Sequence, residues 1–112
     1  MSCIFCQIIE GSIPSKAIYQ DDHCYAFADM KPQAPVHILV VPRQHIPSIA
    51  DAEKTHTELL GHLHWAAAEI ARTKGLSKGY RTVINTGPDG GQTVDHVHLH
   101  LLGGRPMAWP PG

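Results

Sequence analysis

The sequence has no surplus of positive charge. Nine lysine and arginine residues stand against ten aspartate and glutamate residues, which gives the 112-residue chain a formal net charge of −1 at pH 7. Proteins that bind nucleic acid or anionic lipid surfaces through charge need clustered cations to neutralise phosphates. We therefore expect neither nucleic acid nor a membrane among the partners of this chain.

Long hydrophobic runs and paired cysteines are also lacking. The longest aliphatic run is Ile38 to Val41, whereas a transmembrane helix needs about 20 apolar residues. The N-terminus does not show the cationic start and apolar stretch of a secretory signal. The three cysteines, Cys3, Cys6 and Cys24, are too few and odd in number for a disulfide framework. These features predict a cytoplasmic protein.

Nothing in the sequence divides the chain. It contains no internal repeat and no low-complexity segment, and 43% hydrophobic against 17% charged residues is typical of a globular protein. The commonest domain size is about 100 to 150 residues. We expect a single domain over residues 1–112.

The spacing of apolar residues predicts two helices. A short helix is indicated by four apolar residues at helical intervals before Gly11: Ile4, Phe5, Ile8 and Ile9. A long helix between about Ala50 and Lys74 is indicated by a single apolar stripe, formed by Leu60, Leu63, Ala67 and Ile70. A capping box at its start is expected from Ser48 with Asp51, or from Thr55 with Glu58.

Apolar segments between turn signals predict about five strands. They cover Ala17–Tyr19, Cys24–Ala28, Val36–Val41, Tyr80–Asn85 and His96–Leu102. Most of these segments are joined by short turns, which favours antiparallel pairing. We therefore expect an α+β fold on an antiparallel sheet.

Histidine is present in unusual number, with nine copies. Three of them alternate with apolar residues in His96-Val97-His98-Leu99-His100-Leu101-Leu102. Successive side chains of a strand point to opposite faces, so the three imidazoles are expected on one face and the apolar residues on the other. Neighbouring Cβ atoms on that face would lie about 6.5 to 7 Å apart, close enough to surround one phosphate-sized group. Four of the other six histidines are expected in a turn or facing solvent: His23, His56, His62 and His64.

A glycine-rich loop precedes this segment. Gly87, Gly90 and Gly91 permit positive φ and a close approach of the backbone, so that N–H groups could converge on an anion. Gln92 and Thr93 add side-chain donors. Such a run is by itself more often a plain turn, but next to the histidines it favours a phosphate site.

The His96–Leu102 segment resembles the signature of the histidine triad (HIT) superfamily of nucleotide hydrolases and transferases. Further matching motifs follow in order along nearly the whole chain: Ile4-Phe5-x-x-Ile8-Ile9, Ile13-Pro14, Phe27-Ala28-Asp29, Pro32-Gln33-Ala34-Pro35-x-His37, Lys78-Gly79-Tyr80-Arg81, Gly90-Gly91-Gln92, Gly103-Gly104-Arg105 and Trp109-Pro110-Pro111-Gly112. They look like the nucleotide-binding branch whose members are purine nucleoside phosphoramidases. The resemblance implies a HIT-like fold, a five-stranded antiparallel sheet with one long and one short helix.

The resemblance also implies roles for four histidines. His98 matches the nucleophile that takes the nucleoside monophosphate into a covalent phosphoramidate, which water then hydrolyses. The backbone at His96 would orient that ring, His100 would contact the phosphate, and His37 would assist proton movement. A neutral imidazole whose Nδ1–H is held by an acceptor presents Nε2 as an uncharged nucleophile, which suits an anionic phosphorus centre. This catalysis requires no cofactor.

A substrate site follows from the same matches. Asp29 matches the acceptor of the ribose hydroxyls, and Trp109 would influence specificity across a homodimer. Five residues are expected around the base: Phe5, Ile8, Ile13, Phe27 and Met30. Four match positions that contact the phosphate and the leaving group: Asn85, Gly91, Gln92 and Thr93. Thr93 stands where serine is usual.

Cys3 and Cys6 form a C-x-x-C pair that raises the question of a metal. In some bacterial relatives such a pair binds zinc together with histidines that match His45 and His96, and these four residues would make a tetrahedral structural site. Alternatively, both cysteines are small buried hydrophobic residues. A third interpretation is a catalytic metal held by the triad and His37, although no carboxylate is obviously placed to support it.

The expected function is hydrolysis of the P–N bond of purine nucleoside 5′-phosphoramidates by a homodimer, with a purine nucleoside monophosphate or phosphoramidate as ligand. Two alternatives stay open. The chain could be a dinucleoside polyphosphate hydrolase or nucleotidyl transferase of the same superfamily, or a nucleotide-binding regulatory or scaffold protein.

Overall fold

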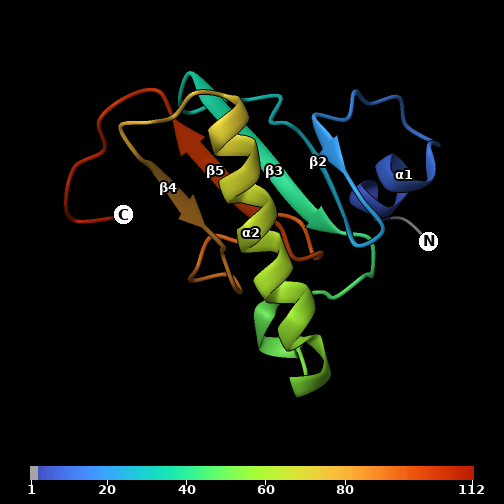
Figure 1. Ribbon diagram of the computed structural model, residues 1–112. Helices are drawn as coiled ribbons and strands as arrows, with labels where there is room; N and C mark the ends of the chain where they lie inside the picture. The colour runs from blue at the N-terminus through green and yellow to red at the C-terminus, as the bar shows by residue number, and fades with distance from the viewer. Residues whose placement is uncertain (1–2) are drawn as a thin grey trace.

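The computed structural model describes residues 3–112 as one antiparallel sheet with a long helix across one face (Figure 1). The strands are β1 (Tyr19–Gln20), β2 (Cys24–Ala28), β3 (Val36–Pro42), β4 (Tyr80–Val83) and β5 (Leu99–Gly103), in the order β1-β2-β3-β5-β4. The helices are α1 (Ile4–Glu10) and α2 (Thr57–Thr73). The α+β class, the five-stranded antiparallel sheet and the pair of one long and one short helix are thus confirmed.

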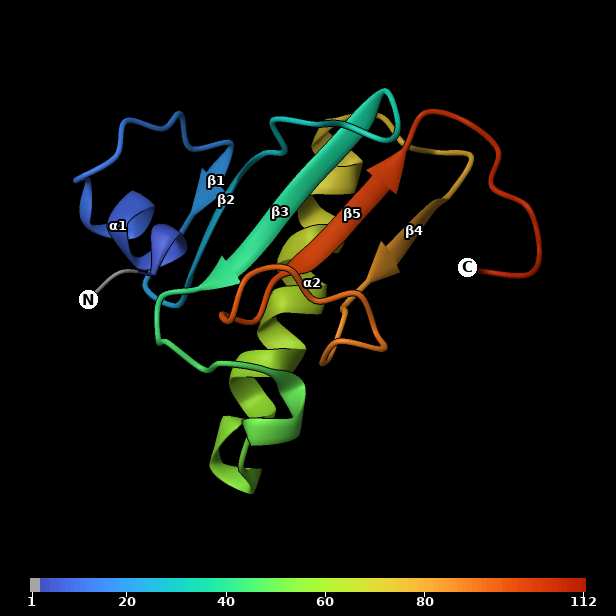
Figure 2. The same cartoon turned by 180° about the vertical axis from the view of Figure 1, so that it is seen from behind.

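Side chains of the two central strands, β3 and β5, point alternately to the two faces of the sheet. Ile38 lies opposite Leu101, and Val40 lies opposite Leu99. These side chains form the main core with five buried residues of α2: Leu63, Ala66, Ala67, Ile70 and Ala71. On the other face, shown in Figure 2, a smaller cluster contains Phe5, Tyr25, Phe27, Leu39 and Val41. Helix α1 therefore covers the part of this second face that β2 forms, whereas the part that β5 forms carries histidines.

Helix α1 forms where the sequence predicted it. Cys3 is its N-cap, and the Sγ atom of Cys3 accepts a hydrogen bond from the Cys6 N–H. Gly11 ends the helix in the left-handed conformation, with φ of 89°, and its N–H bonds back to the last turn. A residue with a Cβ adopts this φ reluctantly, which is why glycine stops the helix here.

Helix α2 begins later than predicted. Two 3₁₀ turns, at Ile49–Asp51 and Lys54–His56, precede it, because Ala52 and Glu53 are extended and interrupt the helical path. The expected capping boxes do not form. Instead the Glu53 N–H donates to Nδ1 of His56 at 2.9 Å, and the Ser48 hydroxyl donates to the carboxylate of Asp51.

Several strand boundaries also differ from the prediction. β1 covers only Tyr19–Gln20 and β4 stops at Val83. The predicted start of the last strand at His96 is wrong, because β5 begins at Leu99. The His96 N–H bonds to the Val94 carbonyl and the Val97 N–H bonds to the Ile46 carbonyl, so this stretch pairs with loops rather than with β3.

Among the helices formed by residues 3–112, none combines the length and the apolar character that crossing a bilayer requires.

Candidate active site

His98 is buried and held in one tautomer. Its side chain is 4% exposed, and its Nδ1 lies 2.7 Å from the carbonyl oxygen of His96. A carbonyl oxygen can only accept, so the proton of the neutral ring is on Nδ1 and Nε2 carries the lone pair. The ring of Phe5 packs against His98 edge to face at 5.1 Å and restricts its rotation. His98 thus has the form of an uncharged nitrogen nucleophile.

His37 and His100 form a directed chain of hydrogen bonds beside it. The Gln33 N–H donates to Nδ1 of His37 at 3.0 Å, so neutral His37 carries its proton on Nε2. That Nε2–H donates to Nδ1 of His100 at 2.9 Å. His100 therefore presents its own N–H at Nε2. Its ring centroid lies 5.0 Å from that of His98, so a lone pair and a donor stand side by side.

The surroundings of His100 favour the neutral form of its ring. Burial, followed by the nearby imidazoles of His98 and His37, lowers the pKa of His100 to about 4. At pH 7 His100 is therefore an uncharged hydrogen-bond donor. Asp29 lies next to the pair, with Oδ2 at 3.4 Å from Nε2 of His37 and Oδ1 accepting the Lys31 N–H.

His96 does not lie on one face with the other two triad histidines, contrary to the sequence prediction. Because β5 starts three residues later, the His96 ring turns toward the N-terminal thiols, where it is fully buried. Its carbonyl still faces His98. Val97, Leu99 and Leu101 are buried against α2 as predicted.

The His96 ring belongs to a second cluster, formed by Cys3, Cys6, His45 and His96. Nδ1 of His96 lies 3.3 Å from Sγ of Cys3, 3.7 Å from Sγ of Cys6 and 3.1 Å from Nδ1 of His45, and Sγ of Cys6 lies 3.4 Å from Nδ1 of His45. In a tetrahedral zinc site with ordinary bond lengths, neighbouring ligand atoms are about 3.3 to 3.8 Å apart. The spacing of the four atoms therefore fits Zn²⁺.

The protonation pattern of this cluster also fits a cation. Nε2 of His96 donates to the Pro42 carbonyl at 2.9 Å, which leaves Nδ1 as a lone pair directed at the thiols, and burial lowers the pKa of His96. Burial, together with the Cys3 thiol, raises the pKa of Cys6 to about 11. Cys6 would lose its proton on binding a metal.

A catalytic metal in the triad fits less well. The ring of His96 is directed away from the other two histidines. Asp29, His37 and His100 have ligand atoms within 4.8 Å of one another, and this carboxylate was not apparent from the sequence. However, the Gln33 N–H occupies Nδ1 of His37, so Nε2 of neutral His37 carries the proton that it donates to His100 and offers no lone pair to a cation.

The glycine-rich loop is shaped by its own hydrogen bonds. A Cβ at Gly90 would lie 2.2 Å from the Thr86 carbonyl oxygen, so only glycine fits there. The Gly87 N–H donates to the Gln92 side chain, and the Gln92 amide donates to the Pro47 and Val94 carbonyls. Asn85 donates to the Gly90 carbonyl at 2.6 Å. The amides of Gly87, Gly91 and Gln92 all bond within the loop, so they do not form the expected cradle of free donors.

The residues expected around a base differ in burial. Phe5 and Phe27 are buried and pack edge to face at 5.7 Å. Ile8 and Ile13 are partly buried, whereas Met30 is 95% exposed and Trp109 is 85% exposed. Thr93 is exposed and follows the loop directly. Contact of these residues with a substrate stays a prediction.

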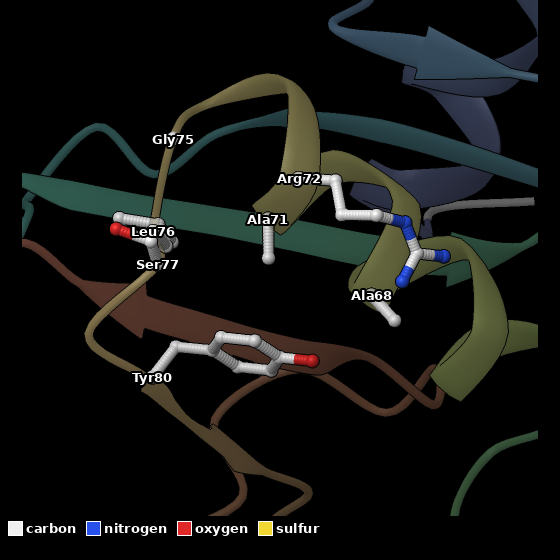
Figure 3. A pocket seen from close by; sticks show the side chains of 7 residues that line it. All are labelled: Ala68, Ala71, Arg72, Gly75, Leu76, Ser77 and Tyr80. Carbon is white, nitrogen blue, oxygen red and sulfur yellow. The ribbon is translucent and has the colours of Figure 1, made fainter.

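A cavity of about 220 Å³ lies elsewhere, between the C-terminal end of α2 and Tyr80 (Figure 3). Tyr80 shares a rung with Gly103, two residues along from the rung of Leu101 and Thr82 and therefore on the same, helix-facing side of the sheet. The cavity therefore lies on the α2 side, away from His98 and His100, and is not part of the histidine site.

Comparison with known proteins identifies the family. The HIT domain family model matches residues 10–107. The chain belongs to the HIT domain family. It is 59% identical to an uncharacterized HIT-like protein of Synechococcus elongatus, over 97% of this chain and 96% of that protein. It is 50% identical to a maize protein named 14 kDa zinc-binding protein, over 97% of this chain and 87% of that one.

Solved structures agree with this family. A HIT family hydrolase from Legionella pneumophila superposes with a TM-score of 0.96 at 46% identity, covering 99% of this chain and 100% of that chain. A histidine triad nucleotide-binding protein from Candida albicans superposes with a TM-score of 0.83 at 30% identity, covering 99% and 85%. HIT-family membership and the HIT fold are therefore shown.

Two features, one in the site and one outside it, could not be predicted from the sequence. The Gln33 backbone N–H fixes the tautomer of His37, and any residue except proline can donate in that way. His62, which was expected to face solvent, is half-buried and donates to Asp21 at 2.6 Å. Asp21 lies in the turn between β1 and β2, so only the tertiary structure brings it to α2.

Proposed function

We propose that this HIT-family protein hydrolyses the P–N bond of purine nucleoside 5′-phosphoramidates, with His98 as the nucleophile. The observation that carries the proposal is the 2.7 Å hydrogen bond from Nδ1 of His98 to the His96 carbonyl. This bond makes Nε2 a neutral nucleophile and stabilises the ring when it becomes positively charged on attack. A hydrolase name for the Legionella relative supports the same class of reaction.

The reaction has two displacement steps. Nε2 of His98 attacks phosphorus, a P–N bond to His98 forms, the P–N bond to the leaving group breaks, and the leaving nitrogen takes up a proton and departs as an amine. Water then attacks the nucleotidyl-His98 phosphorus and gives up a proton to solvent, which balances the proton taken up by the amine; the P–N bond to His98 breaks, and the mononucleotide leaves. The Nε2–H of His100 would bond a phosphoryl oxygen in both steps, next to the His37 pair that fixes it.

We also propose that Cys3, Cys6, His45 and His96 hold a structural Zn²⁺. The ligand-atom spacings near 3.1 to 3.7 Å support this proposal, as does the name of the maize relative. The metal would supply no step of the reaction. Its ligands would fix α1 to the loop that carries His96, and the carbonyl of His96 in turn holds His98.

His98→Ala tests the proposed function. We expect the variant to lose at least about 10³-fold in turnover of adenosine 5′-phosphoramidate, because no other group replaces a missing nucleophile. His64→Ala on α2 is the matched control, since His64 is exposed. An alkaline quench of the wild type with labelled substrate should give a labelled peptide that contains His98. Turnover retained by His98→Ala would refute the assignment of the nucleophile.

The two alternatives give different results in the same assay. A dinucleoside polyphosphate hydrolase or nucleotidyl transferase would act faster on P–O–P than on P–N substrates. A regulatory or scaffold protein would bind purine mononucleotides with negligible turnover of every phosphoramidate. The cytoplasmic location and the absence of nucleic-acid and membrane partners stay predictions.

A further inference from the structure

A further cluster of titratable side chains lies on the α2 side of the sheet, away from His98. A cavity of about 300 Å³ is bordered by α2, by the 3₁₀ turn before it and by the turn between β1 and β2. Figure 1 shows α2 across this face of the sheet. The walls of the cavity carry two imidazoles, a carboxylate, a hydroxyl and an apolar side chain, from His23, His62, Glu58, Thr55 and Leu59. The proposed reaction uses none of these groups.

The ring of His62 is oriented by a carboxylate. Nε2 of His62 lies 2.6 Å from Oδ2 of Asp21. An ionised carboxylate can only accept, so the proton of the neutral ring is on Nε2 and Nδ1 carries a lone pair. Histidines that bind metals usually donate their second ring N–H to a carboxylate, a carbonyl or water in this way. His62 thus has the protonation of a metal ligand.

Asp21 is fully engaged as this acceptor. Its Oδ2 also accepts the Tyr19 hydroxyl at 2.7 Å, and its Oδ1 accepts the N–H groups of His23 and Cys24. Although burial opposes it, the hydrogen bonds hold the pKa of Asp21 well below its usual range, so the carboxylate is ionised at neutral pH.

Asp21 therefore supports a ligand and is not itself one. Asp21, Cys24 and His62 have ligand atoms within 4.8 Å of one another. However, the Asp21 carboxylate already accepts four hydrogen bonds. Burial, with a smaller effect of Asp21, raises the pKa of the Cys24 thiol to about 12. A metal ion at His62 would use Nδ1 and ligands from the cavity instead.

His23 and Glu58 lie within reach of His62. The ring centroids of His23 and His62 are 5.2 Å apart, close to the 4.9 Å between His45 and His96 in the proposed zinc cluster. Glu58 precedes His62 by four residues on α2, which places both side chains on one face of the helix. His23 and Glu58 are exposed, so their side chains can turn toward a shared ion without disturbing the core.

We propose that His23, His62 and Glu58 bind a divalent transition-metal ion at this cavity. Asp21 is the positioning residue that fixes the ring of His62. Two imidazole nitrogens and one carboxylate oxygen suit Zn²⁺, Ni²⁺ and Cu²⁺, and water completes the coordination. The site is separate from the proposed zinc cluster and does not rest on the proposed phosphoramidase function.

Trp65 provides an optical probe of this site. Its ring stacks on that of His62, with centroids 5.6 Å apart, so a paramagnetic Ni²⁺ ion bound to His62 quenches its fluorescence. The chain has two tryptophans, and Trp109→Phe leaves Trp65 as the only one. In that background, with the thiol cluster loaded with zinc beforehand, we expect Ni²⁺ to quench Trp65 with a Kd in the micromolar range. Calorimetry should give one Ni²⁺ per chain.

Three substitutions test the assigned ligands and the role of Asp21. His23→Ala and His62→Ala should each raise the Kd for Ni²⁺ at least about tenfold, because each removes one ligand. In Asp21→Asn the side-chain oxygen keeps the two backbone hydrogen bonds of the turn. Its NH₂ group instead donates to Nε2 of His62 and moves the ring proton to Nδ1, so the Kd should rise about 10- to 100-fold.

The controls separate this site from other histidines and from the thiols. His64→Ala should bind Ni²⁺ like the wild type, since His64 is exposed on α2 and does not line the cavity. Cys6→Ser should keep the quenching of Trp65. Thermal unfolding of each variant shows whether the fold is kept, and His23→Ala in an exposed turn retains the test if His62→Ala lowers the Tm.

Several outcomes would overturn the proposal. A Kd in the millimolar range for the wild type would show an adventitious ion only. Quenching that is unchanged in His23→Ala and His62→Ala, or that is lost in Cys6→Ser, would place the ion elsewhere. Wild-type affinity in Asp21→Asn would remove Asp21 from the site. The measurements use no substrate, so they stand or fall independently of the proposed function.

Discussion

The tautomers of His98, His37 and His100 are set by three neighbours in the folded chain. A carbonyl fixes His98, a backbone N–H fixes His37, and His37 then fixes His100. Each bond is directional, so reversing one would leave two donors or two acceptors facing each other at a cost of about 1 to 3 kcal/mol. The result is a lone pair on Nε2 of neutral His98 next to the N–H on Nε2 of His100.

The low pKa of His100 predicts a loss of stability in acid. Unfolded histidine has a pKa of about 6.5, whereas folded His100 has a pKa of about 4. Between these values the unfolded chain binds a proton that the folded chain does not. The free energy of unfolding should therefore fall as the pH drops from 6.5 to 4, by about 2 kcal/mol from this residue.

Urea unfolding at pH 7, 5 and 4 measures this effect. His100→Gln should show a shallower fall in the free energy of unfolding than the wild type, because glutamine does not titrate. His64→Gln on exposed α2 is the control and should follow the wild type. Parallel curves for His100→Gln and the wild type would contradict the assigned cause.

The short helix α1 depends on its contacts with the rest of the molecule. A seven-residue helix is not stable by itself in water, and Phe5 with the two thiols provides its attachment. The cluster around His96 joins this helix to the loop before β5. Losing that junction should affect both the helix and the alignment of His98.

Removal of zinc should therefore lower both stability and activity. We expect one zinc per chain in purified wild type and none in Cys6→Ser, with a fall in Tm of several degrees, since about 1 kcal/mol corresponds to about 4 to 8 °C for a domain near this size. A chelator should lower the Tm of the wild type and leave that of Cys6→Ser unchanged. Metal-free wild type with an unaltered Tm after chelation would refute the structural zinc site.

Strand β4 forms one of the two edges of the sheet in residues 3–112. β4 is the last strand in the order and pairs only with β5 within residues 3–112, and Tyr80 on it is 44% exposed. An edge strand offers unpaired N–H and C=O groups to another chain. The homodimer that the sequence resemblance implies stays a prediction, and β4 is the edge at which we expect it to form.

Sedimentation equilibrium at micromolar concentration tests the homodimer. The expected mass is twice the 12.2 kDa of the chain. Thr82→Pro on β4 should shift the mass toward that of one chain, because proline removes an N–H from the strand and fits poorly in a paired position. His64→Ala serves as the unchanged control. A single 12.2 kDa species for the wild type would contradict the prediction.

Local patterns determined much of the fold. The apolar stripes of α1 and α2, the stop at Gly11 and the alternation through Val97, Leu99 and Leu101 each depend on residues close in sequence, and all are found in the structure. The C-x-x-C spacing singled out Cys3 and Cys6, whereas His45 and His96, which the fold brings to them, were implied only by the family resemblance. Such features are periodic or contiguous, so they are visible without a folded chain.

Tertiary contacts decided what the patterns could not. The rule of alternating strand faces placed His96 with His98 and His100, but the Val97 N–H bonds to Ile46 of a distant loop, and the strand starts only at Leu99. The proton positions on the histidines and the hydrogen bond from Arg81 to Ala108 likewise depend on backbone carbonyls and amides. Every residue carries those groups, so their partners are set by the folded path of the chain and not by residue type.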